Sequence, residues 1–157
     1  MTMSKAAGRP NWLAVIRRYL LASAAGHLAW ETAQLPLYTL WRTGSARDIA
    51  QALLHCALGD LSIAIVVLVI ALAAVGAPVW PEQLWGTVML TVLIMGAGYT
   101  VYSEYMNTVV WQRWSYAASM PTLPWLGTGL SPLAQWMVVP GVALAWAGRG
   151  RPSRQGL

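Results

Sequence analysis

The 157-residue sequence contains no phenylalanine, a single cysteine and few charged residues. Because Cys56 is alone, a disulfide within the chain is excluded. Charged residues make up 10% of the sequence and hydrophobic residues 57%. A soluble domain carries about 25% charged residues, so this composition argues against one. The sequence also lacks an HExxH motif, paired CxxC motifs, a P-loop and a dinucleotide fingerprint, which leaves no common metal or nucleotide signature.

What the sequence does contain is a series of long apolar runs, several of which reach the roughly 20 residues needed to cross a bilayer core. We therefore predict an all-α fold, in which residues 20–148 form one polytopic membrane domain. Its four-transmembrane-helix bundle is expected at about residues 20–41, 49–75, 84–105 and 131–148. Residues 1–19 form a basic N-terminus and residues 149–157 a basic tail. The ten Trp and six Tyr residues suit a membrane interface.

Residues 107–130 are too interrupted for a membrane span, because they hold two Pro, two Gly and three Trp. Non-helical backbone at membrane depth has to be covered by protein or water. This segment is therefore predicted to be an interfacial loop or a lid over the bundle. The helix after it is expected to start with Ser131 as N-cap and Pro132 in the first helical position.

The basic residues predict an orientation. With four spans, the N-terminus, the second loop and the tail lie on one side and carry seven Lys and Arg, against three on the other side. The positive-inside rule then places both termini in the cytoplasm, most simply of a bacterial inner membrane. The net charge of +5 follows from this topology, so no nucleic-acid partner is expected. A homo-oligomer is left open.

Three of the five acidic residues, Glu31, Asp60 and Glu104, fall inside predicted spans. A carboxylate at the bilayer centre costs at least about 2.5 to 3.5 kcal/mol, so such groups usually face the interior of a bundle and mark a site. The other two, Asp48 and Glu82, stand at helix starts, where negative charge suits the helix dipole.

The polar residues of the spans follow helical spacing. His27, Glu31 and Gln34 lie at i, i+4 and i+7, on one stripe of the first helix. We predict a polar pocket in the outer half of the membrane, with Glu31, His27 and Asp60 as the catalytic residues. Further residues are expected to bind a ligand there: Trp30, Gln34, His55, Tyr99, Glu104, Asn107 and Trp136.

A His and a Glu one turn apart can relay a proton, and nearby aromatic faces can stabilise a carbocation. These residues predict cofactor-independent proton-transfer chemistry on an apolar small molecule, with no metal. One alternative is a small transporter or ion-binding protein that uses Glu31, His55 and Asp60 for protons or a metal ion. Another is a structural subunit of a larger membrane complex.

Three short motifs occur in the order found in the four-helix EXPERA domain of the emopamil-binding sterol isomerases. GHLAWE carries the His-x-x-x-Glu of the first helix on His27 and Glu31. GYTVYSEYMN has the Tyr followed by a distal Glu of the third helix. QWMVVPGVAL matches the last helix through Trp136, Pro140 and Gly141. Over about residues 20–148 the chain resembles this family.

The resemblance implies an intramembrane cavity that holds a sterol-like or other polyisoprenoid lipid, with His27 and Glu31 moving a proton in an isomerase or cyclase reaction. The sequence departs from the family pattern at two places. The asparagine that the isomerases carry one turn before the last Trp is Leu133 here. Their second-helix acid has no clean counterpart, since Gln51 is nearest by register and Asp60 lies further along.

Overall fold

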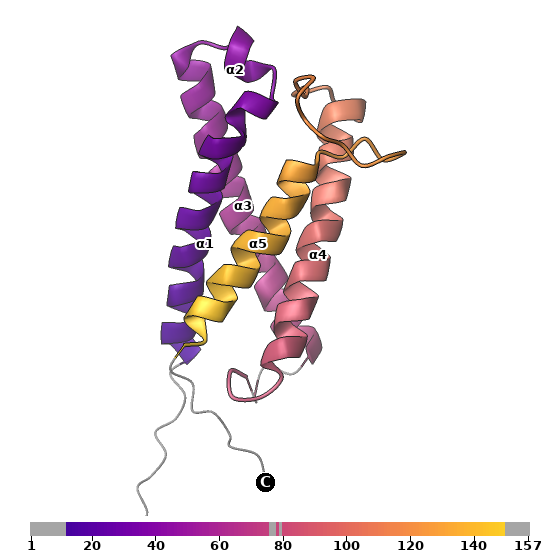
Figure 1. Cartoon of the computed structure of the whole chain (residues 1–157). Coiled ribbons are helices and arrows are strands. Elements are labelled where there is room, and N and C mark those ends of the chain that lie inside the picture. The colour runs from indigo at the N-terminus through magenta and orange to yellow at the C-terminus, as the bar shows by residue number, and fades with distance from the viewer. Residues whose placement is uncertain (1–11, 76–77, 79, 150–157) are drawn as a thin grey trace, which may run out of the picture.

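The computed structural model describes residues 12–75, 78 and 80–149, and their regular structure is helical (Figure 1). Four helices are long: α1 (Trp12–Gln34), α3 (Ala46–Val75), α4 (Trp85–Tyr105) and α5 (Leu130–Ala147). Between α1 and α3 lie the 3-10 turn η1 (Leu35–Leu37) and the short helix α2 (Leu40–Thr43). A π-helical turn, η3 (Met106–Val110), extends α4. The expected all-α class is confirmed for the described residues.

The long helices form a closed arrangement in which α1 packs on α3 and α5, and α4 packs on the same two helices. The first and last described residues lie at one end of the bundle, and α2 and residues 111–129 lie at the other (Figure 1). At the first end, the Arg18 guanidinium donates a hydrogen bond to the Arg149 carbonyl oxygen (3.3 Å). Because the bundle has four long helices, the start of α1 and the end of α5 lie at the same end (Figure 1).

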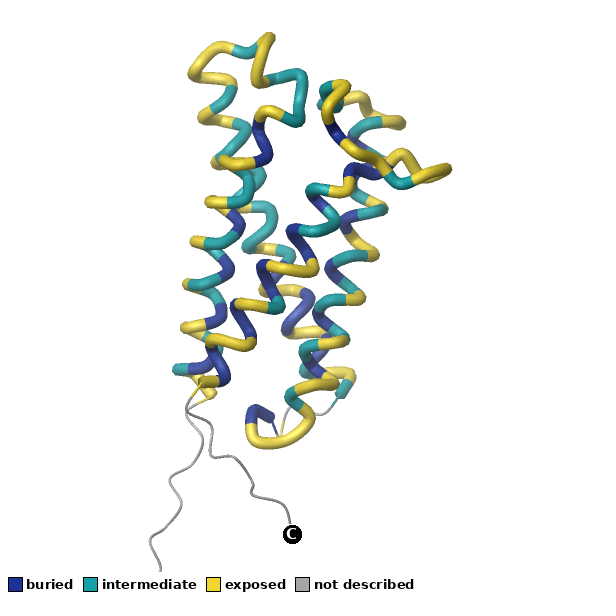
Figure 2. Tube along the Cα trace, in the orientation of Figure 1, coloured by how far each residue is buried: buried dark blue, intermediate teal, exposed yellow. Residues whose placement is uncertain are grey.

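The apolar core fills the half of the bundle that holds the chain ends. It is built from the start of α1, the second half of α3, the start of α4 and the end of α5, and includes Val15, Tyr19, Ala64, Val67, Leu68, Ala71, Val88, Val92, Ala143 and Leu144. Figure 2 shows buried positions along the inward faces of these helices. The cluster of buried acidic and amide side chains lies in the opposite half of the bundle.

The first helix differs from the predicted span of residues 20–41, because α1 is already helical at Trp12 and ends at Gln34. Pro36 has no backbone N–H to give to the helix, so the chain continues as the 3-10 turn and then becomes extended at Tyr38. The polar stripe thus ends at Gln34. Arg17 and Arg18 of the predicted basic N-terminus lie within α1.

The other helix boundaries lie within three residues of the prediction. Helix α3 begins at Ala46, and Ser45 and Asp48 exchange hydrogen bonds at its start, with 2.9 Å from the Ser45 N–H to the Asp48 carboxylate. This is a capping-box arrangement.

The prediction that Ser131 caps the last helix is wrong. Helix α5 begins at Leu130 without a side-chain cap, and the Ser131 hydroxyl bonds to Gln34 instead.

The outward faces are strongly apolar. Large exposed side chains follow the length of α3, α4 and α5, among them Leu54, Leu58, Val66, Val69, Leu90, Ile94, Val138 and Val142. Contiguous exposed apolar surface of this kind marks contact with a membrane or a partner. Three helical stretches, Ala46–Val75, Trp85–Val110 and Leu130–Ala147, are long and apolar enough to cross a membrane. Helix α1, which carries Arg17, Arg18 and Glu31, is not among them.

The contact between α4 and α5 depends on Gly96. A Cβ atom at this position would lie 2.3 Å from Cε3 of Trp136, far inside van der Waals contact. We expect Gly96→Ala to push the Trp136 ring out of place and to lower the free energy of unfolding by about 1 to 3 kcal/mol. Thermal unfolding of the purified protein in detergent measures this change.

Gly98→Ala is the matched control, because a Cβ atom there meets nothing within 4 Å. This variant should be as stable as the wild type or slightly more stable, since Ala favours a helix over Gly. Equal stability of the two variants would show that the Gly96 approach does not limit helix packing.

Candidate functional site

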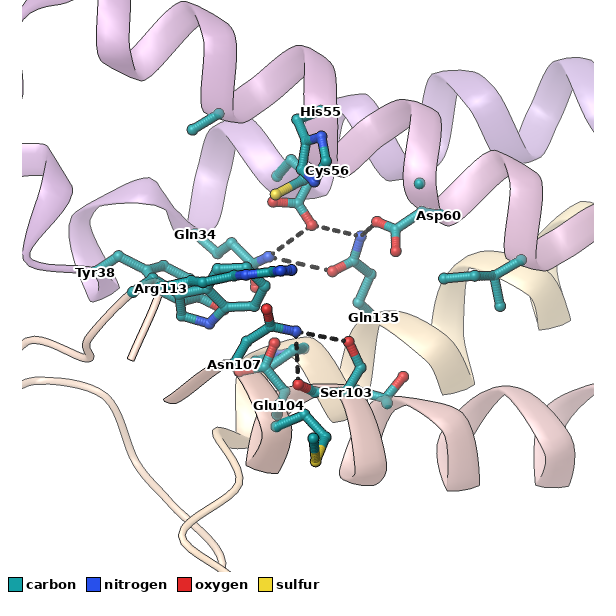
Figure 3. Close-up of a pocket in the computed structure, with 18 of the residues that line it drawn as sticks. Gln34, Tyr38, His55, Cys56, Asp60, Ser103, Glu104, Asn107, Arg113 and Gln135 are labelled. Atoms are coloured by element: carbon teal, nitrogen blue, oxygen red, sulfur yellow. Dashed lines mark hydrogen bonds between the residues drawn. The ribbon is translucent and has the colours of Figure 1, made fainter. Parts of the chain in front are cut away.

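A cavity of about 310 Å³ lies in the half of the bundle opposite the apolar core. All four long helices contribute to its wall, together with Tyr38 and residues 111, 113 and 114. Figure 3 shows side chains from these elements converging on one space. Acidic residues of three different helices, Glu31 of α1, Asp60 of α3 and Glu104 of α4, line it. Most of the remaining wall is apolar or aromatic.

The side chain of Gln135 on α5 joins the acidic residues. Its amide nitrogen lies 3.1 Å from a Glu31 oxygen and 2.9 Å from an Asp60 oxygen (Figure 3). It also lies 3.0 Å from Nδ1 of His27. Gln135 is fully buried, so these contacts form away from water. Since both carboxylates contact the same nitrogen, their nearest oxygens are no more than about 6 Å apart.

The amide nitrogen of Gln135 faces more hydrogen-bond acceptors than it has hydrogens to donate. A primary amide nitrogen carries two hydrogens, and here it faces three acceptor atoms. Two ionised carboxylates at this distance also repel each other. A proton on one of the two carboxylates removes both problems. The geometry therefore provides a position for an exchangeable proton at the cavity wall.

His27 lies behind this wall. It is completely buried, its ring packs 5.1 Å from the ring of Trp136, and it is not among the residues that line the cavity. Its Nδ1 lies 3.5 Å from Asp60, and the amide of Gln135 lies between it and Glu31. An amide nitrogen can only donate, so Nδ1 is the acceptor in this contact. The direct partners of His27 are therefore Gln135 and Asp60.

A chain of hydrogen bonds fixes Gln135 from the α1 side. The amide nitrogen of Gln34 donates to both Glu31 (2.9 Å) and the oxygen of Gln135 (3.2 Å). The oxygen of Gln34 accepts from the Ser131 hydroxyl (2.8 Å), which in turn accepts from Nε1 of Trp30 (3.2 Å). Trp30 thus supports the site from outside the cavity wall, since it is not one of the lining residues.

Residues 111–129 form a strap at the end of the bundle that holds the cavity (Figure 1), and Trp111, Arg113 and Trp114 of this segment line the cavity. Two backbone hydrogen bonds fasten this strap to the segment between α1 and α2, from Thr39 N–H to Ser115 (3.0 Å) and from Ala117 N–H to Leu37 (2.9 Å). On the other side, the Tyr116 hydroxyl donates to the Glu104 carboxylate and accepts from the Gly129 N–H. These contacts join the strap to the segment after α1 and to α4.

The two tyrosines at the strap remain protonated at neutral pH. Burial raises the pKa of Tyr116, and the hydrogen bond and charge of Glu104 raise it further. Burial also raises the pKa of Tyr38, and Glu104 adds to this effect. The Tyr38 ring lies 5.5 Å from that of Tyr116. The Tyr116 phenol therefore keeps the proton that it donates to Glu104, and the Tyr38 phenol remains a donor at the cavity wall.

Most of the residues predicted from the sequence line this one cavity: Glu31, Gln34, His55, Asp60, Tyr99, Glu104, Asn107 and Trp136. His27 and Trp30 lie behind it. Sequence reasoning missed the central role of Gln135 and the contributions of Tyr38, Arg113 and Tyr116. For Gln135 a signal was available, because an amide inside an apolar span demands partners.

The cavity offers no obvious metal centre. Within residues 12–75, 78 and 80–149, no group of three His, Cys, Asp or Glu side chains is placed to hold a metal ion. His55 is exposed at the cavity edge, and His27 is separated from Glu31 by Gln135.

Comparison with known proteins gave no relative: the chain matches no family model, no curated protein and no solved structure. The geometry of the cavity is thus the basis for any functional assignment.

Gln135→Leu should destabilise the protein strongly. The substitution leaves Glu31, Asp60 and His27 without their shared donor, and each unsatisfied buried group costs about 1 to 3 kcal/mol. We expect a clear fall in the thermal unfolding temperature in detergent. Gln51→Leu is the matched control, since Gln51 is exposed on the same bundle. If both variants unfold at the wild-type temperature, the hydrogen-bond network does not hold this half together.

Tyr116→Phe should loosen the strap without unfolding the helices. It removes the bonds to Glu104 and to the Gly129 N–H, each worth about 1 kcal/mol, so backbone amides in residues 111–129 should exchange with deuterium several-fold faster. The Tyr116 phenol stays protonated at pH 10.0 because its pKa is raised above that value. In the wild type, the protection of these amides from exchange should therefore persist to pH 10.0 and be lost only at higher pH. Tyr105→Phe, at an exposed position, should leave exchange unchanged.

Proposed function

We propose that this chain is an integral membrane protein that binds an apolar isoprenoid- or sterol-like lipid in the cavity and transfers a proton to and from it. In this proposal α1, α3, α4 and α5 all cross the membrane, with both termini in the cytoplasm of a bacterial cell. The distribution of Lys and Arg supports that orientation.

The observation that carries the proposal is the pair of carboxylates, Glu31 and Asp60, which share the nitrogen of Gln135 at the wall of a largely apolar cavity. In the proposed reaction, one carboxylic acid gives its proton to a carbon of a double bond. The resulting carbocation loses a different proton to the neighbouring carboxylate, so that the double bond moves and the pair of carboxyl groups again holds one proton. No redox partner or cofactor is needed.

The aromatic lining supports a carbocation intermediate. Trp136 and Tyr99 line the cavity, and the faces of such rings attract positive charge. The EXPERA resemblance supports the same class of reaction. The amide that is missing at Leu133 has a substitute in Gln135, which brings an amide to the carboxylates from α5.

The cavity wall also supports entry from the bilayer. His55 on α3, and Tyr99 and Tyr102 on α4, line the cavity and are also exposed. The cavity thus reaches the surface of the bundle where α3 faces α4. That surface is flanked by exposed apolar side chains such as Leu54 and Leu58. A lipid is better suited to this route than a hydrated ion.

Mild detergent extraction followed by mass spectrometry should recover a stoichiometric isoprenoid-type lipid from the wild-type protein. After incubation in deuterated water, that lipid should carry deuterium bound to carbon, because the carboxylic acid exchanges its proton with solvent. Glu31→Gln should retain the lipid and abolish the deuterium incorporation. Glu82→Gln, at an exposed position away from the cavity, should match the wild type.

Three other outcomes would contradict the proposal. Retained lipid without deuterium would reject the proton transfer and leave the binding role. A stoichiometric transition metal on elemental analysis would favour an ion-binding protein. Protein free of lipid and metal that purifies with a stable partner chain would favour a structural subunit.

A further inference from the structure

Asn107, in the turn η3, presents an unpartnered oxygen at the cavity. Its amide nitrogen donates to the Ser103 carbonyl oxygen (2.8 Å) and lies 3.3 Å from the Ser103 hydroxyl (Figure 3). A carbonyl oxygen only accepts, so the nitrogen must face Ser103, and the identity of the other atom, Oδ1, is fixed. Oδ1 is buried and has no partner within the described residues.

A hydrogen-bond donor for Oδ1 of Asn107 would have to come from a molecule in the cavity. Asn107 is 6% exposed and lines the cavity, close to Glu104. A buried acceptor without a donor is unfavourable, and native proteins rarely leave one unsatisfied. A ligand that places a hydrogen-bond donor at Oδ1 would remove this cost. Asn107 is thus suited to hold the polar head of a bound molecule.

The charge of that head is restricted by two neighbours. An anionic head has only acceptor atoms and would be repelled by Oδ1. Arg113 also lines the cavity, and its backbone N–H donates to the Asn107 carbonyl oxygen (2.8 Å), which keeps the two residues together. Its guanidinium lies over the Trp111 ring, 4.4 Å from the centroid, and offsets part of the attraction that Glu104 has for an ammonium head. A neutral hydroxyl satisfies Oδ1 without bringing a further charge into the cavity.

We infer that the ligand of this cavity is a lipid alcohol, whose hydroxyl donates to Oδ1 of Asn107 while its hydrocarbon body lies against the apolar wall. This inference rests on the proposed lipid-binding function and adds the head group to it. It makes Asn107 a residue that determines specificity, separate from the carboxylates that exchange the proton.

Matched pairs of probes test the inference: farnesol against farnesyl methyl ether, and cholesterol against its 3-methyl ether. The two ethers keep the body and remove the donor. Wild-type protein should bind the alcohol of the preferred pair about tenfold more tightly than the ether, as expected for one buried hydrogen bond. The pair that binds more tightly distinguishes a linear isoprenoid from a sterol. Equilibrium dialysis of the labelled probes in detergent measures both affinities.

Asn107→Leu should bind alcohol and ether within about twofold of each other, because the acceptor is gone. Thr108→Val is the control, since the Thr108 hydroxyl bonds to the Glu104 backbone and does not line the cavity. It should keep the wild-type preference. If Asn107→Leu does not fold, a farnesol analogue with a diazirine beside the hydroxyl should still label residues 106–113 of the wild type.

The remaining outcomes separate the two proposals. Wild-type protein that binds alcohol and ether equally would overturn the hydroxyl assignment and leave lipid binding intact. Tighter, Asn107-dependent binding of farnesylamine would replace the hydroxyl with a cationic head. Failure to bind any of the probes, with no lipid recovered on extraction, would overturn the proposed function itself.

Discussion

The polar half of this bundle depends on a single amide nitrogen. Through it, Gln135 connects α5 to Glu31 and His27 on α1 and to Asp60 on α3. Each of those groups would be costly in an apolar interior without a donor. Gln34, Ser131 and Trp30 in turn hold Gln135 in one orientation. The carboxylates can therefore stand close together at the cavity wall because one well-fixed donor is shared among them.

The sequence predicts much of this architecture, for reasons that are local. Apolar runs of bilayer length indicate the long helices, and helical spacing places His27, Glu31 and Gln34 on one face. Acids within apolar segments have to turn inward, which is why the convergence of Glu31, Asp60 and Glu104 could be expected. The boundary of α1 was harder to predict, because the helix continues through Arg17 and Arg18 toward the chain start.

Other features of the site could not be read from the sequence because they depend on contacts between distant residues. Gln135 and Glu31 are more than one hundred residues apart, and no periodicity indicates which acceptors an amide will meet. The hydrogen bond between Tyr116 and Glu104 depends on the path of an irregular segment. The separation of His27 from Glu31 by Gln135 likewise depends on how α5 packs against α1. Periodicity assigns residues to faces, and packing decides their partners.

The two ends of the bundle are stabilised by different forces. Close packing of Val, Leu and Ala holds the end near the chain termini, while hydrogen bonds among side chains hold the end with the cavity. Packing energy is insensitive to protonation, whereas a network of acids and amides is not. The packed end can therefore anchor the helices while the protonation state of the cavity end changes.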